Sequence, residues 1–350
     1  MPHLTHDELT RTTFPVAAEL TGGRPTQLVT LPGGASLRRY HRIVLDGGNA
    51  PTLVVMELGD NPLKSEEAAK GAAPTELPFI NVQRYLARAG AAVPAIHRYD
   101  AERGLLYIED LGDITFESRV LDADDEVRGR YYRQAIDQLV ALQQFAADHP
   151  DPDCVAFSRA FDYDLLKWEL DHFREYGLEA QGHTPTASER EELERIFRAV
   201  AEELAAEPRG FVHRDYQSRN LMVQDTSNGP RLRLIDFQDA LLGTRAYDLV
   251  GLLRDSYVAL SPSLLDALVS HYVARAGADT DAFMRLFDLQ VVQRKLKDAG
   301  RFVFIDRVKH NPSFLIHIPN SIAYVARSLS RLPELGTLRE ILSHHLGGFR

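Results

Sequence analysis

Two motifs carry the strongest signal in this sequence, HRDYQSRN at residues 213–220 and LIDFQD at residues 234–239. The first places Asp215 in a polar loop with Asn220 five positions later, and the second places Asp236 directly after a short apolar run typical of a strand. Short apolar runs on both sides of the polar turn DTSNGP predict a hairpin between the two motifs. We therefore expect the loop and the end of the hairpin to bring two carboxylates and an amide into one cleft.

These residue types suit phosphoryl transfer. A hydroxyl nucleophile needs a carboxylate that orients it and receives its proton, and nucleotide phosphates need a divalent metal held by hard oxygen ligands. Two other interpretations are an ordinary polar loop beside a strand that ends in Asp, and a metal-hydrolase site made of His213, Asp215 and Asp236. No other His is placed to complete that ligand set. The joint pattern of both motifs, the hairpin and a β-rich region upstream favours phosphoryl transfer.

Upstream of the motifs, the chain is rich in strand signals. Runs of β-branched and aromatic residues are separated by clusters of Gly, Asp and Asn, the usual sign of hairpins. One stretch has apolar residues at helical spacing and ends at a glycine. The expected strands cover residues 27–31, 37–45, 51–58, 95–99 and 105–109, and the expected helix covers residues 78–89.

Further along the chain, helical spacing of apolar residues dominates, and only the region around the two motifs interrupts it. One of these helices starts with a Thr-x-x-Glu capping box at Thr186. The expected helices cover residues 131–146, 164–176, 188–205 and the chain from about residue 248 to its end. The sequence thus predicts an α+β fold with a β-rich first part and a mostly helical second part.

Composition excludes several classes of function. The 350 residues carry 40 Lys and Arg against 50 Asp and Glu, a net charge of −10, which argues against a general nucleic-acid binder and against attachment to an anionic membrane. No stretch reaches the roughly 18 apolar residues of a membrane span. The first residues lack the apolar core of a secretory signal, so we expect a cytoplasmic protein. Cys154, the single cysteine, excludes a disulfide framework and a thiolate zinc site, and a buried thiol is expected.

Taken together, the motifs resemble the aminoglycoside phosphotransferase and choline kinase-like family, relatives of the protein kinases. Within that family the chain is most similar to the cell-wall amino-sugar kinases, which phosphorylate the anomeric hydroxyl of N-acetylmuramate and N-acetylglucosamine. The resemblance runs from about residue 30 to about residue 335. It rests on the stretches GGASLRRYHRI, LLYIEDLGD, FVHRDYQSRNLMV, LRLIDFQDALLGTRAYDLVGLLRDSYV, QRKLKDAGRFVFIDRV and FLIHIPNSIAYV.

The resemblance implies a fold and a set of catalytic roles. The fold is protein kinase-like and two-lobed. Asp215 is implied as the catalytic base, Asn220 and Asp236 as metal ligands, and ATP and Mg²⁺ as cofactors. Asp248 corresponds to a position that braces the catalytic loop. The implied parts are a β-rich, nucleotide-binding N-lobe, a hinge and a helical C-lobe with the catalytic loop and acceptor site, at residues 1–108, 109–113 and 114–350.

For the nucleotide, the resemblance assigns adenine to backbone groups of the hinge from Glu109 to Leu111, and the ribose to Asp113. The alternative is a plain connector with exposed acids. The stretch PGGASLRRY lies where the family covers the phosphates, and the small residues Gly34 and Ser36 would let backbone N–H groups approach phosphate oxygens. By itself, such a stretch between strands is more often a hairpin turn, and only its position in the lobe favours phosphate contact.

One departure from the family concerns the Lys of the third strand, which pairs with a helix Glu and holds the α- and β-phosphates. Here that strand reads LVVMEL, with Met56 and Glu57 at the expected place, and the helix after it contains no acid. Losing both partners together avoids a stranded charge. We expect Arg38 or Arg39, or less readily Lys64, to supply the positive charge. The alternatives are that these are solvated surface residues, or that the protein is a non-catalytic kinase, against which the intact motifs argue.

The acceptor is expected to be a small molecule. The run from residue 236 to residue 248 leaves little room for the activation loop of protein kinases, and no A-P-E motif follows. Trp168, the lone tryptophan, could stack on a sugar, although packing in the core is the more common role of such a residue. The polar candidates for acceptor contacts are Gln217, Arg219, Asp239, Arg254, Asp255 and Tyr257.

The segment RKLKDAGRFVFIDRVK, residues 294–309, holds six basic and two acidic residues. A basic contact would suit an acceptor with a carboxylate, such as N-acetylmuramate, whereas a polycationic aminoglycoside would prefer an acidic cleft. The more usual interpretation of such a segment is a charged helix surface.

The function expected from these arguments is an ATP- and Mg²⁺-dependent kinase that phosphorylates the anomeric hydroxyl of an amino sugar of cell-wall recycling. The expected partner is a small-molecule sugar acceptor, with no nucleic acid and no membrane, and the expected state is a monomer or weak dimer. The alternatives are an aminoglycoside or other small-alcohol phosphotransferase of the same fold, and a nucleotide-binding pseudokinase.

Overall fold

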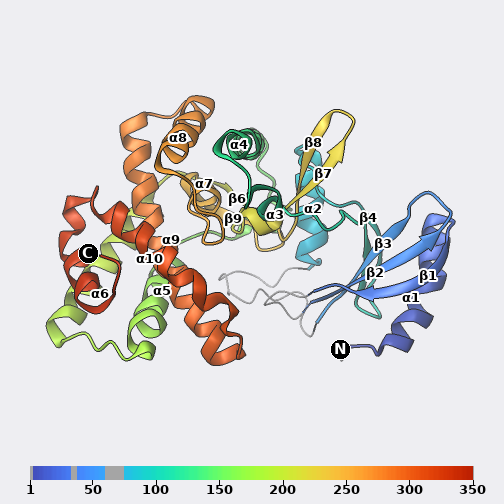
Figure 1. The fold of residues 1–350 in the computed structure, drawn as a ribbon, viewed down its shortest axis with the longest axis horizontal. Helices are drawn as coiled ribbons and strands as arrows, with labels where there is room; N and C mark the ends of the chain where they lie inside the picture. The colour runs from blue at the N-terminus through green and yellow to red at the C-terminus, as the bar shows by residue number, and fades with distance from the viewer. Residues whose placement is uncertain (1–2, 33–37, 60–74, 350) are drawn as a thin grey trace. The chain divides into compact units, whose positions relative to one another are not determined.

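The computed structural model describes residues 3–32, 38–59 and 75–349, which divide into two compact units. The first unit contains the described residues up to Ile114 together with Met222–Gln238, and the second contains Thr115–Leu221 and the described residues from Asp239 onward. A sheet forms the centre of the first unit, and helices make up most of the second (Figure 1). The predicted α+β fold, β-rich first and helical afterwards, is confirmed.

The first unit is built on a five-stranded sheet in the order β1-β2-β3-β5-β4, in which all neighbours are antiparallel. Its strands lie within a few residues of those expected, and Gly47 and Gly48, both at positive φ, make the turn between β2 and β3. The elements are β1 Arg24–Thr30, β2 Arg39–Asp46, β3 Thr52–Glu57, β4 Ile96–Asp100, β5 Leu105–Ile108 and the expected helix α2 Pro78–Arg88.

Helix α1, His6–Thr21, is an element that the sequence analysis missed. Its start carries a capping box between Thr5 and Glu8, a signal that was present in the sequence. The helix buries Leu9 and Ala17 in an apolar cluster with side chains of the sheet. Threonines share this buried face, so the apolar period is weak and does not mark the helix.

The hairpin expected between the two motifs is confirmed as β7, Leu221–Thr226, and β8, Gly229–Leu234. The backbone N–H of Leu234 donates to the carbonyl of Ala92 at 2.8 Å. This bond to the segment before β4 helps to explain why Met222–Gln238 belongs to the first unit, although it follows long helices in the sequence.

The second unit consists of helices and one small sheet, in which β6, Arg209–Val212, pairs with β9, Leu241–Thr244. The three helices predicted before the motifs are found, and helices resume after them as predicted. The helices are α3 Phe116–Val120, α4 Asp125–Asp148, α5 Tyr163–His172, α6 Ala187–Ala206, α7 Ala246–Leu253, α8 Pro262–Ala276, α9 Thr280–Lys309, α10 Ile318–Leu329 and α11 Gly336–His345. Within the described ranges, we find no helix with the length and apolar character needed to cross a membrane.

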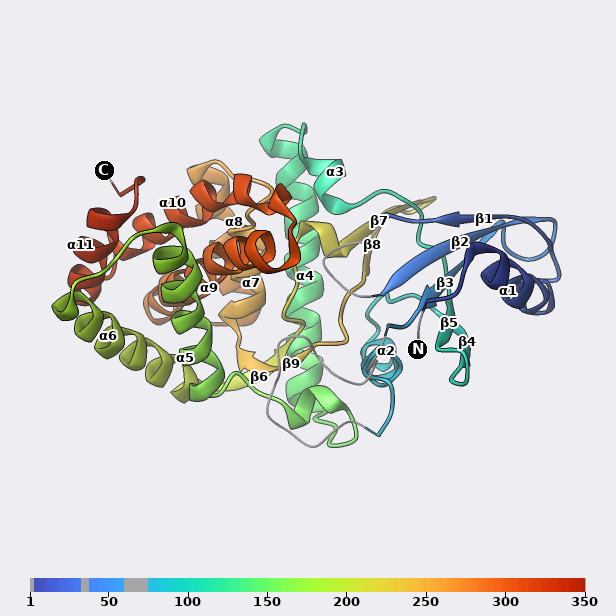
Figure 2. The ribbon, with the colours of Figure 1, turned by 90° about the horizontal axis from the view of Figure 1, so that it is seen from below.

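The 30-residue helix α9 lies among the other helices of the second unit and contacts α5, α7 and α10 (Figure 2). Most of its residues between Phe283 and Ile305 are buried, charged ones included. It also packs closely against a π-helical turn, Phe173–Leu178, that continues α5. A Cβ atom on Gly300 would lie only 2.7 Å from the Cα atom of Phe173, so this approach requires glycine.

Candidate active site

The loop of residues 213–220 follows β6 and is held by Asp248 of α7. The Asp248 carboxylate accepts the backbone N–H of His213 at 2.7 Å and that of Arg214 at 3.0 Å. Arg214 has a positive φ of 78°, so the chain turns sharply just before Asp215. Burial raises the pKa of Asp248 to about 7, against the lowering effect of the two N–H donors. The predicted brace of the loop is confirmed.

Asp215 is fixed from two sides. The Asn220 Nδ2 atom donates to the Asp215 carbonyl at 3.0 Å. From α9, Arg294 donates through Nη1 to the Arg214 carbonyl at 2.7 Å and holds Nη2 3.9 Å from Asp215 Oδ1. The Asp215 side chain is 33% exposed, so a ligand can reach its carboxylate. Because the Nδ2 atom of Asn220 donates to the loop backbone, the Oδ1 atom of Asn220 is the amide atom suited to bind a cation.

Arg219 lies over an aromatic pair beside the loop. Its guanidinium donates through Nε to Glu117 Oε2 at 2.8 Å and lies 3.6 Å from the centroid of the Tyr257 ring. The Tyr257 ring in turn meets His317 edge-on, with 4.7 Å between the ring centroids. Arg219 is thus held by a carboxylate and a ring at the same time.

Two acceptor candidates of the sequence analysis are buried. Both oxygens of Asp255 accept backbone N–H groups, from Ser218 at 2.8 Å and from Tyr257 at 3.0 Å. Arg254 is 2% exposed, and its guanidinium lies 5.1 Å from the ring centroid of Tyr324. Asp255 therefore acts as a second brace of the loop, and neither side chain opens to solvent.

The other two acceptor candidates, Gln217 and Asp239, are partly exposed. Burial lowers the pKa of Arg159, and the negative charge of Asp239 opposes that effect. Asp239 therefore lies close enough to Arg159 for the two charges to interact.

The first part of the basic segment 294–309 is not a solvated surface, and that expectation is wrong. Arg294 and Lys295 are each 1% exposed, and Lys297 is 8% exposed. Lys295 Nζ donates to Asp298 Oδ2 at 2.7 Å, and Lys297 Nζ lies 3.8 Å from Asp298 Oδ1. These charges are tolerated inside the unit because carboxylates and a carbonyl oxygen face them.

Trp168 is also placed differently from the more common expectation of a core residue. It is 46% exposed, and its ring stacks on that of His172, with centroids 5.3 Å apart. His172 also contacts Tyr176 and Phe304 of the same unit. The tryptophan therefore covers the outer side of an aromatic cluster.

In the first unit, Asp236 follows β8 with a positive φ of 63° and a side chain that is 43% exposed. Gln238 Nε2 donates to Asp236 Oδ1 at 2.8 Å and so orients the carboxylate. Arg38 Nη1 lies 3.7 Å from the same oxygen, whereas Arg39 is exposed. Of the two arginines considered as a replacement for the strand lysine, Arg38 is therefore the one beside Asp236.

At the position expected for the strand lysine, the structure has two buried side chains. Met56 is fully buried, and Glu57 is 3% exposed. Glu57 Oε1 accepts the backbone N–H of Leu4 at 2.6 Å, and its other oxygen lies 3.0 Å from His3 Nδ1. The Glu57 carboxylate is thus committed to the N-terminal segment. Three residues of the predicted phosphate site lie outside the described residues, namely Gly34, Ser36 and Lys64.

Glu109 lies in a dense set of hydrogen bonds after β5. Its N–H donates to the Ala95 carbonyl at 2.8 Å, and its Oε2 accepts from the Ala95 N–H at 3.0 Å and from Arg233 Nη2 at 2.5 Å. Burial opposes ionisation, but these bonds leave the pKa of Glu109 below its ordinary value. Leu111, two residues later, is buried. The Glu109 side chain therefore anchors the β7–β8 hairpin through Arg233.

Asp113 has a side chain that is 76% exposed. Its carboxylate accepts from Arg42 at 2.9 Å, and the same guanidinium donates through Nε to Asp110 at 2.5 Å. Both acids of this connector are therefore tied to β2, and Asp113 remains accessible on its outer side.

The second unit brings Asp215, Asn220 and Arg219 together, and the first brings Arg38 to Asp236. Sequence reasoning missed Glu117 and His317 as neighbours of the catalytic loop. No local pattern marks either residue, because each meets the loop only through tertiary packing.

Comparison with known proteins gives the same family for the chain. The model of the Phosphotransferase enzyme family matches residues 27–287. The chain is 31% identical to a protein named N-acetylmuramate/N-acetylglucosamine kinase from Pseudomonas putida, over 92% of this chain and 89% of the relative. It is 32% identical to a protein of the same name from Pseudomonas aeruginosa, over 91% and 88%.

Solved structures share the fold. A choline kinase from Streptococcus pneumoniae superposes with a TM-score of 0.60 at 14% identity, covering 94% of this chain and all of the other. An ADP-bound aminoglycoside phosphotransferase gives 0.57 at 15% identity, covering 90% and 97%. The fold is therefore protein kinase-like, with a β-sheet N-lobe and a helical C-lobe. The chain belongs to the phosphotransferase enzyme family and is an enzyme that transfers a phosphoryl group to a hydroxyl.

Proposed function

We propose that this enzyme transfers the γ-phosphoryl group of ATP, with Mg²⁺, to the anomeric hydroxyl of N-acetylmuramate or N-acetylglucosamine. The observation that carries the proposal is the similarity, over about nine tenths of the chain, to relatives named as kinases of these two sugars. The geometry of the catalytic loop supports it, since the loop presents an accessible carboxylate beside an amide. A cytoplasmic location, where ATP is supplied, is part of this proposal.

In the second unit, Asp215 acts as the base. Its carboxylate accepts a hydrogen bond from the anomeric hydroxyl, orients the oxygen toward the phosphorus and takes up the proton during transfer. The Asn220 and Arg294 contacts hold the backbone on both sides of Asp215, so the carboxylate needs little reorganisation.

The donor set suits Mg²⁺. Asn220 offers an amide oxygen and Asp236 a half-exposed carboxylate, both of them hard oxygen ligands. When bound, the metal neutralises charge on the phosphates. Gln238 fixes the orientation of the Asp236 carboxylate, and Arg38 adds beside it a positive charge that would replace the charge of the missing strand lysine.

The proposal keeps the predicted division of the chain into an N-lobe, a hinge and a C-lobe, at residues 1–108, 109–113 and 114–350. It assigns the nucleotide contacts to the N-lobe and the hinge. Because the Glu109 N–H is bonded to Ala95, adenine would pair with the Glu109 carbonyl and the Leu111 N–H. Asp113 would reach the ribose with its exposed side. The phosphates would be covered by the backbone around Gly34 and Ser36.

The test is nucleotide consumption with a panel of amino sugars, aminoglycosides and amino alcohols, with products identified by ³¹P NMR. We expect turnover with N-acetylmuramate and N-acetylglucosamine and an anomeric phosphate as product. Asp215→Asn should lose at least about a hundredfold in kcat while keeping nucleotide affinity. Turnover with aminoglycosides or amino alcohols alone, or an undiminished kcat in the variant, would reject the proposal.

A further inference from the structure

Two histidines at the end of α11, His344 and His345, converge on the carboxylate of Glu189 in the first turn of α6. The two helices pack against each other in the second unit, although 155 residues separate His344 from Glu189 (Figure 2). Nδ1 of His344 lies 3.0 Å from Glu189 Oε1, and Nε2 of His345 lies 3.3 Å from Glu189 Oε2. Among the described residues, this is the one group of three His, Cys, Asp or Glu side chains whose possible ligand atoms all lie within 4.8 Å of one another.

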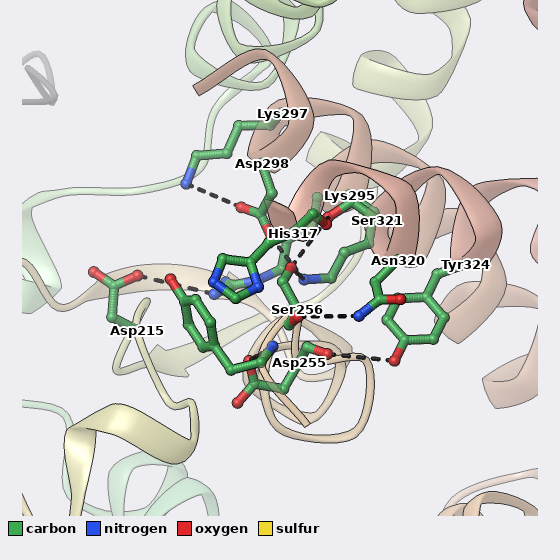
Figure 3. Close-up of polar contacts among 12 residues, drawn as sticks. Asp215, Asp255, Ser256, Lys295, Lys297, Asp298, His317, Asn320, Ser321 and Tyr324 are labelled. Carbon is green, nitrogen blue, oxygen red and sulfur yellow. Dashed lines mark hydrogen bonds and ion pairs between the residues drawn. The ribbon is translucent and has the colours of Figure 1, made fainter. Parts of the chain in front are cut away.

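The Nε2 atom of His345 is buried, yet it makes no hydrogen bond within the described part of the chain. Its approach to Glu189 is close, but it lacks the geometry of a hydrogen bond. Lys295 of the same unit shows the more usual arrangement, since its ammonium group donates to Asp298 at 2.7 Å and to Ser256 at 3.2 Å (Figure 3). A buried polar atom without such a partner is costly, so the position of the His345 nitrogen points to a ligand.

The carboxylate of Glu189 is fixed by the capping box of α6. Its Oε2 atom accepts the backbone N–H of Thr186 at 2.7 Å, and the Glu189 N–H donates to the Thr186 hydroxyl at 3.2 Å. A carboxylate oxygen has two lone pairs, so Oε2 can accept this N–H and still face a cation. The negative charge is therefore held at the place where the two imidazole nitrogens meet.

This donor set suits Zn²⁺. The ion binds imidazole nitrogen and carboxylate oxygen at about 2.0–2.2 Å, which places neighbouring ligands of a tetrahedral shell about 3.4 Å apart. The separations of 3.0 and 3.3 Å from Glu189 are close to that value, and the His344 ring, whose side chain is 71% exposed, can turn toward a cation. Mg²⁺ and Ca²⁺ prefer sites made of oxygen, so two imidazoles select against them.

A histidine elsewhere in the second unit shows what an ordinary ion pair looks like. His271 Nε2 lies 2.9 Å from Asp137 Oδ1, and Arg275 donates through Nε to the same oxygen at 2.9 Å. A guanidinium has no lone pair to offer a metal, so this group contains one imidazole and one carboxylate only. It provides a matched comparison for the group at Glu189.

We propose that Glu189, His344 and His345 form a Zn²⁺ site that ties the C-terminal helix α11 to the start of α6. The side chains supply one oxygen and two nitrogens, and water completes a tetrahedral shell. Because the ligands come from helices that are distant in sequence, the folded chain binds the ion and the unfolded chain does not hold them together, so binding stabilises the fold. None of the three residues belongs to the proposed catalytic or nucleotide sites, and the inference does not depend on the proposed function.

The experiment titrates ZnCl₂ into the full chain, prepared without a histidine tag and stripped of metal with a chelator, and measures binding by calorimetry. In His345→Gln we expect the affinity for Zn²⁺ to fall by about a hundredfold or more, since even the partners of metal ligands contribute about tenfold to a hundredfold. His271→Gln is the control and should bind Zn²⁺ like the wild-type protein. At Zn²⁺ about a hundredfold above the dissociation constant, the Tm of the wild-type protein should rise by about 3 °C or more, and MgCl₂ should not reproduce this rise.

Co²⁺ in place of Zn²⁺ reports the coordination directly, because a tetrahedral Co²⁺ ion absorbs visible light far more strongly than the hydrated ion. We expect this absorption in the wild-type protein and in His271→Gln, its loss in His345→Gln, and its displacement by Zn²⁺. If His345→Gln does not fold, His344→Gln takes its place, because that exposed side chain can be replaced without loss of packing. Equal Zn²⁺ affinity of wild-type protein and either histidine variant, or a wild-type protein that binds no Zn²⁺, would overturn the inference.

Discussion

The guanidinium of Arg38 lies 3.7 Å from the carboxylate of Asp236, within the first unit. Protein kinases and their relatives place a strand lysine near the phosphates, and here the strand position is filled by buried Met56. Arg38 reaches Asp236 from the residue just before β2. Arg38 thus places a positive charge beside Asp236.

If Arg38 replaces the strand lysine as proposed, Arg38→Met should raise the KM for ATP about tenfold or more, because the positive charge assigned to the phosphates is removed. Steady-state kinetics with varied ATP at saturating acceptor will measure this effect. Arg39→Met, at an exposed neighbouring position, is the control and should leave the KM for ATP nearly unchanged. Equal effects of the two substitutions would assign the role of Arg38 to general surface charge.

Asp236→Asn should weaken the Mg²⁺-dependent part of ATP binding, because an amide is a poorer ligand for a hard cation than a carboxylate. Calorimetric titration with ATP, in the presence and absence of Mg²⁺, should show a metal-linked gain in affinity for the wild-type protein and little gain for the variant. Asp239→Asn, three residues later, should retain the gain. A preserved gain in Asp236→Asn would remove this residue from the metal site.

The pH dependence of stability should contain a component from Asp248. Burial raises the pKa of Asp248 from 3.8 to about 7, so between these values the folded protein binds more protons than the unfolded chain. The free energy of unfolding should therefore fall as the pH rises from about 4 to about 7. Above the folded-state pKa, the full cost of burying the ionised Asp248 carboxylate is present.

Asp248→Asn should flatten that pH profile, because the amide does not titrate. It should also lower kcat about tenfold or more, since an amide oxygen replaces only one of the two acceptors for His213 and Arg214. Urea unfolding at pH 5 and pH 8, with and without the substitution, will measure the first effect. Asp266→Asn, at an exposed position, is the control. If the free energy of unfolding differs between pH 5 and pH 8 by the same amount in Asp248→Asn as in the wild-type protein, Asp248 is not the titrating group.

Gly300→Ala should destabilise the second unit by about 1–3 kcal/mol. Its Cβ would lie 2.7 Å from the Phe173 Cα and 3.1 Å from the His172 carbonyl oxygen, and backbone atoms cannot move aside by changing a rotamer. Thermal and urea unfolding will measure the loss. Gly129→Ala in α4 is the matched control, because the nearest atoms there are the ends of the Arg133 and Leu264 side chains and alanine favours the helix.

Local sequence patterns determined much of this protein. The strand and helix periods gave the five-stranded sheet, α2, the hairpin between the motifs and the main helices, because each depends on spacing within a short window. The same is true of the loop with Asp215 and Asn220 and of the strand end at Asp236. Helix α1 was not predicted because its buried face is partly made of threonines.

The roles of the charged residues depend on tertiary packing. Arg254 and Asp255 looked like acceptor contacts, yet both are buried, and Asp255 bonds the catalytic loop from 37 residues away in sequence. Lys295 and Lys297 looked like a solvated helix face, yet packing places them inside the second unit around Asp298. A charge can be buried only where distant residues supply its partners, and a pattern read along the chain contains no such distances.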